Sequence, residues 1–129
     1  MNSFGGPAGS TITGSGLISV RGGNGNGFGG GGAGGRVLIN FATNSFSGTL
    51  SACGGAGYEA GGAGTIRLAP AEQLIVDNCG LSGASTPLSQ SVGFAPNLAV
   101  GNGATIELQG ALPIFSNVVV ASGGTITGV

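Results

Sequence analysis

Short apolar runs, separated by glycine-rich stretches, set the pattern of this chain. In one run, Val37, Ile39 and Phe41 alternate with other residues and would share one face of a strand. Glycine recurs too often before residue 65 for a helix of useful length. The runs that we expect to form strands are 11–13, 17–20, 36–41, 48–53, 65–68, 73–77, 97–100, 104–108, 117–121 and 125–127. The pattern therefore predicts an all-β fold.

Two segments depart from this simple alternation. Pro70 suits a first helical position and Gly80 a helix stop, so a short helix could form over 70–79. The β-rich run at 74–76 favours a strand there instead. Residues 81–96 lack alternation and contain two prolines, so we expect an excursion loop in that range.

The chain also resembles itself along its length. Residues 16–23 resemble 48–55 at an offset of 32, and the glycine patch at 31–34 recurs at 61–64. The four residues 65–68 return, with one change, at 105–108. Chance matches are common in glycine-rich chains, but here strand positions match as well as glycines. The comparison favours a repeat architecture.

Short strands at regular spacing are typical of a coil in which each turn adds strands to several parallel sheets. Strands of about 4–6 residues and turns of about 2–6 give roughly 20–30 residues for each three-sided turn. We therefore predict a right-handed parallel β-helix (β-solenoid) of roughly five rungs, forming a single domain over 1–129 with one excursion at 81–96. Glycines would mark its corners, and aliphatic side chains would form its inner column.

The composition and charge of the chain disfavour nucleic acid and membranes as partners. The 129 residues carry three Arg or Lys, four acids and a net charge near −1, so no basic footprint favours nucleic acid or an anionic membrane. No apolar stretch of about 18 residues is present, which argues against membrane insertion. The start of the chain lacks the pattern of a signal peptide. We interpret the chain as a fragment or module of a longer protein.

A family resemblance lies in the glycine patches and the strands that follow them. The patch leading into 35–39, followed by 46–52, resembles repeats of large glycine-rich surface proteins. The tail at 115–127 is similar to rungs of bacterial autotransporter-like and pectin-lyase-like adhesins. The resemblance implies a right-handed parallel β-helix, an extracellular or cell-surface location, and a structural or adhesive role. Enzymatic members of these families use acidic clusters, and no such cluster is visible in this sequence.

The residues needed for most catalytic sites are missing. Without histidine, Ser-His-Asp and Cys-His arrangements are excluded, and two cysteines alone make a poor zinc site. The acids Glu59, Glu72, Asp77 and Glu107 are scattered, and solvated turn positions explain them most simply. A G-x-G-x-x-G match at 25–30 has no following helix to bind a phosphate. We expect no enzymatic activity, no cofactor and no metal.

The two cysteines of the chain could form a disulfide. Cys53 and Cys79 lie 26 residues apart, near the length of one rung, and each ends a strand run. At equivalent places in successive rungs their Cα atoms would be about 4.8 Å apart, inside the disulfide window of roughly 4.4–6.8 Å. An extracellular protein would permit the bond. Two buried free thiols are the alternative.

Two sets of surface residues suggest ligands. Arg21, Arg36 and Arg67 occupy comparable repeat positions and could form a ladder facing an acidic glycan, although covering apolar surface and capping carbonyls explains them more simply. The Thr-x-Thr runs at 11–13 and 125–127 match the pattern of ice-binding solenoids, which gives ice binding as a minor hypothesis.

Neutrality, repetition and the missing catalytic groups together indicate a structural or adhesive module. Such a module would show no turnover and would bind glycan surfaces or copies of itself. A solenoid whose end strands are unpaired invites association, so we predict end-to-end oligomers or filaments. The alternative is a remnant of a polysaccharide-binding or polysaccharide-degrading protein.

Overall fold

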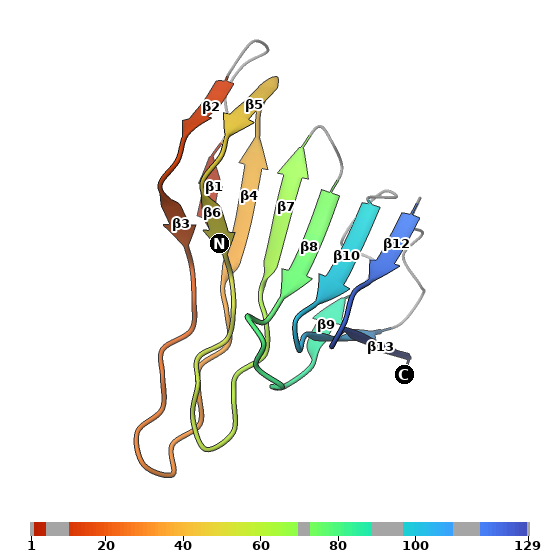
Figure 1. The fold of residues 1–129 in the computed structure, drawn as a ribbon. Coiled ribbons are helices and arrows are strands. Elements are labelled where there is room, and N and C mark those ends of the chain that lie inside the picture. Colours follow the sequence, from red (N-terminus) through yellow and green to blue (C-terminus); the bar gives the residue numbers. More distant parts are fainter. Residues whose placement is uncertain (1, 5–10, 70–72, 89–96, 110–116, 129) are drawn as a thin grey trace.

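The computed structural model describes residues 2–4, 11–69, 73–88, 97–109 and 117–128 (Figure 1). The described residues form strands and turns, which confirms the all-β fold. They include no helix that is long and apolar enough to cross a membrane. The strands are β1 (Asn2–Phe4), β2 (Thr11–Gly14), β3 (Leu17–Ser19), β4 (Arg36–Asn40), β5 (Thr43–Phe46), β6 (Thr49–Ser51), β7 (Thr65–Ala69), β8 (Gln73–Asp77), β9 (Thr86–Leu88), β10 (Asn97–Gly101), β11 (Thr105–Leu108), β12 (Asn117–Val120) and β13 (Thr125–Gly128).

A six-stranded sheet runs through the molecule in the order β1-β4-β7-β8-β10-β12. The chain leaves this sheet and returns to it, so that Val37 pairs with Ile66, and Leu98 with Val118, in parallel strands. These returns span 29 and 20 residues, and they give a winding like that of a β-solenoid. Parallel pairing holds for every neighbouring pair except β7 and β8.

The β7–β8 pair corrects the expectation of an all-parallel winding. Leu68 pairs with Gln73 in antiparallel strands, so the chain turns back on itself there. In Figure 1, β4 and β7 point up, whereas β8, β10 and β12 point down. The physical reason is the short distance along the chain, because a parallel connection needs a dozen or more residues. We call the part before this reversal the N-terminal stack and the part after it the C-terminal stack.

Each stack has smaller sheets of its own. In the N-terminal stack β2 pairs with β5 and β3 with β6, and in the C-terminal stack the order is β13-β11-β9. The 32-residue repeat corresponds to real pairing, because Leu17 lies beside Thr49. The similarity of 65–68 to 105–108 has no such meaning, because β7 and β11 lie in different sheets.

The two stacks bury opposite faces of the shared sheet. In the N-terminal stack, Val37 and Ile66 belong to one apolar core. In the C-terminal stack, Leu74 and Leu98 belong to another. The register explains the change of face, because Leu74 lies opposite Arg67 and not opposite Ile66. Full burial of such side chains contributes about 1.5–3 kcal/mol each, so both cores stabilise the fold by excluding water.

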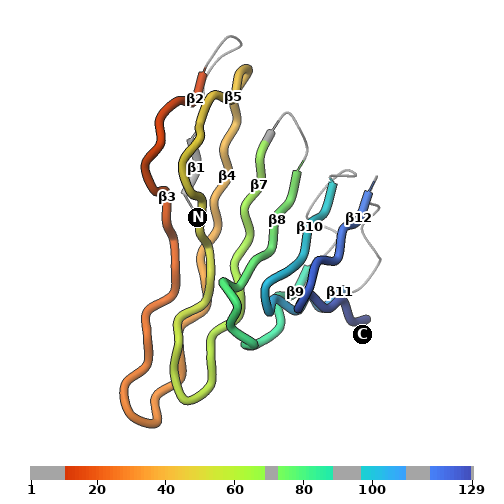
Figure 2. The backbone as a smooth tube through the Cα atoms, in the orientation of Figure 1, coloured from red at the N-terminus to blue at the C-terminus, as the bar shows by residue number. Residues whose placement is uncertain are grey.

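Two glycine-rich loops, 20–35 and 52–64, lie side by side and extend away from the strands (Figure 2). We call them the glycine layer. Hydrogen bonds join them at every third residue: Gly22 N–H donates to the carbonyl of Cys53 at 2.9 Å, and Gly25 N–H to that of Ala56 at 2.7 Å. The three-residue spacing of these hydrogen bonds matches polyproline II chains, which have three residues per turn. It does not match a β-ladder, which repeats every second residue.

The glycine layer is packed in more than one direction. In the returning arm of the first loop, Gly32 N–H donates to Gly23 of the same loop, and the Gly32 carbonyl accepts from Gly55 of the second. Gly34 in that arm donates to Gly62, in the other arm of the second loop. The backbone of this arm is therefore hydrogen-bonded to three neighbouring segments, whereas a strand inside a sheet is hydrogen-bonded to two. The glycines form a packed layer and do not simply mark corners, as the sequence suggested.

Part of the range expected to be an excursion loop belongs to the winding. Within 81–96, Gly83 bridges to Ala60 of the glycine layer, and Thr86–Leu88 forms β9. Thr86 pairs with Ile106 in the second sheet of the C-terminal stack. The remainder of that expected loop, 89–96, lies outside the described residues.

Candidate functional site

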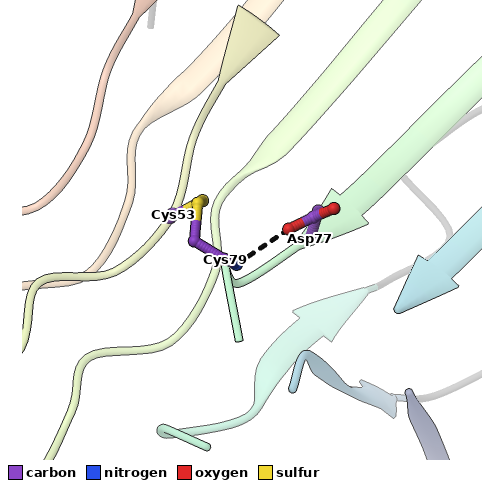
Figure 3. Close-up of side chains that lie close together, drawn as sticks. All are labelled: Cys53, Asp77 and Cys79. Carbon is purple, nitrogen blue, oxygen red and sulfur yellow. Dashed lines mark hydrogen bonds between the residues drawn. A yellow bond between two sulfur atoms is a disulfide. The ribbon is translucent and has the colours of Figure 1, made fainter. Parts of the chain in front are cut away.

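The cysteines lie where the two stacks meet (Figure 3). Cys53 follows β6 and Cys79 follows β8, and a disulfide joins them with a Cα–Cα distance of 5.9 Å. The pair does not occupy equivalent places in parallel rungs, because the chain has reversed between them. The bond instead connects the N-terminal stack to the C-terminal stack. The alternative of two free thiols does not describe this structure.

Asp77 completes a compact group with the two cysteines. One atom from each residue, Sγ or a carboxylate oxygen, lies within 4.8 Å of the others. A metal would need thiolates, and here the two sulfur atoms are bonded to each other. The carboxylate is also occupied, because Oδ1 accepts from Cys79 N–H and Oδ2 from Asn102 Nδ2, both at 2.7 Å. We therefore assign this group a structural role.

Asn78 is a buried polar residue that sequence reasoning missed. Its side chain is fully buried, and its Oδ1 accepts from Gly54 N–H at 2.7 Å. Its Nδ2 donates to the carbonyls of Gly61 at 3.0 Å and Leu81 at 2.7 Å. The amide thus fixes the glycine layer to the turn after β8. Its place at a strand end, just before Cys79-Gly80, was the available signal.

The acids do not assemble into a catalytic pair among the described residues. Glu59 is exposed, and Glu72 lies outside those residues. Asp77 and Glu107 stand on strands of different sheets. Glu107 accepts hydrogen bonds from Gln109 at 2.9 Å and from Ser85 at 3.4 Å.

Two of the three arginines line one cavity of about 530 Å³. Arg36 pairs with Thr65 and Arg67 with Leu38, so the two arginines lie on the same face of β4 and β7, two positions apart in register. Arg21, in the glycine layer, is not part of this lining. The structure therefore brings together a pair and not a ladder of three.

The threonine runs lie apart. Thr11 pairs with Thr43 in the β2–β5 sheet, whereas Thr125 pairs with Thr105 in the β11–β13 pair. The two Thr-x-Thr strands belong to separate sheets and do not form one continuous face. The arrangement that ice binding would require is not assembled from these two runs.

Two aromatic side chains are exposed on the glycine layer. Phe28 is 89% exposed and Tyr58 is 70% exposed, one in each loop. Their ring centroids lie 5.5 Å apart, with an angle of 68° between the planes. Such edge-to-face pairs gain about 0.5–1.5 kcal/mol. Large exposed apolar groups held next to each other are typical of binding surfaces.

No protein-family model matches this chain, and comparison with curated proteins and with solved structures found no match. Its function must therefore be argued from the geometry. Three surfaces of the molecule could bind a partner: the arginine-lined cavity, the exposed aromatic pair and the exposed valines of β12.

Proposed function

We propose that this chain is a non-catalytic structural and adhesive module, built as a right-handed β-solenoid with one reversal. The disulfide supports an extracellular or cell-surface location, because such bonds persist in oxidising compartments. Membership of the autotransporter-like and pectin-lyase-like surface proteins is part of the same proposal. It is supported by the winding of short parallel strands.

The observation that carries the proposal is the exposed end strand β12. Val118 and Val120 continue the columns of Leu98 and Val100, whose side chains are buried. Yet Val118 is 48% exposed, Val119 59% and Val120 51%. The last described rung therefore presents apolar side chains where the preceding rung is covered. An edge strand of this kind is a ready template for pairing.

A second copy of the chain is the occupant that we propose for this edge. Native edges are usually protected by charges or proline, but Asn117–Val120 and the neighbouring Thr125–Gly128 contain neither. Two β12 strands related by a two-fold axis normal to the sheet would run antiparallel. They would keep the same face of the sheet inside, so each would cover the valines of the other.

Head-to-tail filaments are the other association that this edge allows. The N-terminal stack buries the face that carries Val37, which is the opposite face from that of Val118. By translation alone, a head-to-tail contact would place the valines beside the outer face of the N-terminal stack. Only a copy turned by half a turn about the axis along which the strands stack would bring its β1 parallel to β12 with the inner faces aligned. We propose the closed dimer because its contact uses the exposed β12 valines of both copies; the filaments expected from the sequence are the alternative, and they would grow beyond two copies in sedimentation.

Sedimentation velocity over a concentration series tests the proposal. The unaltered chain should form a dimer at micromolar concentration. Val119→Lys should give a monomer, because it places like charges together beside the two-fold axis. Leu17→Lys is the matched control, since it adds the same charge to an exposed residue on β3, and it should remain dimeric. A monomer at high concentration, or a dimeric Val119→Lys, would contradict the proposal.

Polysaccharide binding is a second candidate, favoured by the exposed Phe28–Tyr58 pair. The apolar face of a sugar ring can pack against such rings, while the Tyr58 hydroxyl bonds to water or to the ligand. Binding to a panel of insoluble polysaccharides should fall with Phe28→Ala and Tyr58→Ala and persist with Tyr58→Phe. Equal binding by all variants would exclude this surface.

A further inference from the structure

The arginine cavity is a separate feature from the dimer edge and the aromatic pair. It lies between the outer face of β4 and β7, the glycine layer and β9. We define it by Arg36, Arg67, Leu38, Leu74 and Leu88, which all line it. Its volume of about 530 Å³ falls in the range of small-molecule sites, roughly 300–1,000 Å³.

The reversal of the chain is what forms this cavity. Arg36, Leu38 and Arg67 are on the outward face of the N-terminal stack. Leu74 projects from that same face of the sheet but belongs to the core of the C-terminal stack. The outer surface of one stack therefore continues into the inner surface of the other. Charged and apolar groups meet there as a consequence.

The cavity has the charge of an anion site. Two guanidinium groups line it, and among the described residues no Asp or Glu does. Among the described acids, Glu107 is linked to the lining, because it accepts a hydrogen bond from Ser85 at 3.4 Å. Guanidinium groups bind carboxylates and sulfonates through two parallel hydrogen bonds. A single anionic group could therefore be held between Arg36 and Arg67.

The remaining lining selects an apolar body over a sugar. Leu38, Leu74 and Leu88 supply aliphatic surface. The hydroxyl of Thr86 is already committed, because it donates to the carbonyl of Ala63 at 2.6 Å. The hydroxyl of Ser85 bonds to Glu107. Few polar side chains remain to pair with several sugar hydroxyls, and unpaired buried hydroxyls are costly.

We propose that the arginine cavity binds a small organic anion that carries one carboxylate or sulfonate on an apolar ring. The proposal is independent of the dimer and of the aromatic pair, since it uses different residues. Isothermal titration calorimetry with 2-naphthoate and with 2-naphthalenesulfonate tests it on the full chain. Both should bind saturably at one site per chain, whereas 2-naphthalenemethanol and galacturonate should bind at least tenfold more weakly.

Variants locate the site. Arg36→Gln should weaken 2-naphthoate binding about tenfold or more, and because Arg36 is exposed the fold should be unaffected. Arg67→Lys keeps the charge but loses the planar fork and should weaken binding several-fold. Arg21→Gln changes net charge equally outside the cavity and should bind like the unaltered chain. Methyl resonances of Leu38 and Leu74 should shift on binding.

Several results would overturn the proposal. They are the absence of saturable binding by either naphthalene anion, equal weakening by Arg21→Gln and Arg36→Gln, galacturonate binding as tight as that of 2-naphthoate, and ligand-induced shifts at Val118 in place of Leu38. The first result would show that the chain does not bind these anions. The second would show that binding does not occur at the arginine cavity, and the third that the site does not prefer an apolar ring. The last would place the ligand on the exposed edge of β12.

Discussion

Ile66 and Ile75 lie opposite each other across the antiparallel β7–β8 pair, and both contact the core of the N-terminal stack. The next residue back from Ile75, Leu74, points the other way and is buried in the core of the C-terminal stack. The inner face of the sheet therefore changes within one strand. Because the two cores share no buried residue, the stacks are joined by the β7–β8 pair and by links that follow β8.

The disulfide is the covalent link, and its removal should lower stability. A cross-link that closes a loop of this length contributes about 3–4 kcal/mol by restricting the unfolded chain. Replacing Cys53 and Cys79 together by serine should therefore lower the denaturant midpoint measured by circular dichroism. A reducing agent should lower the midpoint of the unaltered chain and leave the double variant unchanged. A midpoint that is insensitive to reductant in both proteins would contradict this role.

Asn78 is the polar link, and Asn78→Ala should be among the most destabilising single changes. It leaves Gly54 N–H and the carbonyl of Gly61 without the side chain that they bond to. Each buried group left unpaired costs about 1–3 kcal/mol, so we expect a loss of roughly 2–4 kcal/mol.

The matched control for this change is Asn24→Ala. Its side chain also accepts a bond from a backbone amide, that of Ala56, but in an exposed setting where water can replace it. The loss there should stay within about 1 kcal/mol. Chemical denaturation of both variants measures the difference, and equal losses would show that Asn78 does not hold the glycine layer.

The glycine layer predicts a sharp contrast between neighbouring glycines. A Cβ atom added at Gly55 would overlap the carbonyl oxygen of Gly23, whereas one added at Gly23 would meet nothing within 4 Å. Gly55→Ala should therefore disrupt the layer and prevent cooperative folding, because two backbones would have to separate. Gly23→Ala should fold normally. Thermal unfolding followed by circular dichroism distinguishes them, and similar curves for both would argue against close packing here.

The strands were largely predictable, because period-two alternation records which residues face a core. Each of the ten runs expected from the sequence contains a strand. Three strands were missed: β1, β5 and β9. β5 (Thr43–Phe46) is short and largely polar, and β9 (Thr86–Leu88) is short and contains proline. In such strands the pairing partner, and not the side-chain pattern, decides the conformation.

The spacing of two expected strands already indicates the reversal. Only four residues separate the expected strands 65–68 and 73–77, which is too few for a turn around the winding. The glycine layer was harder to foresee. Its hydrogen bonds recur every third residue, and glycine runs carry no side chain that reveals which face is packed.

The arginine cavity could not be derived from the sequence. The sequence offered a ladder of Arg36, Arg67 and Arg21 only as the less simple interpretation, and two of the leucines that line the cavity, Leu74 and Leu88, come from β8 and β9, after the reversal. Only the register of the sheet places Leu74 opposite Arg67. Without the antiparallel pair, nothing indicates that these residues meet.

Because β7 and β8 form an antiparallel junction between the two stacks, either stack could lengthen without changing the other. Among the described residues, the outermost strands of the shared sheet are β1 in the N-terminal stack and β12 in the C-terminal stack. A duplicated turn of about 30 residues on the first side, or 20 on the second, would leave the opposite register intact. Lengthening by tandem duplication is therefore possible on either flank without redesign of the centre.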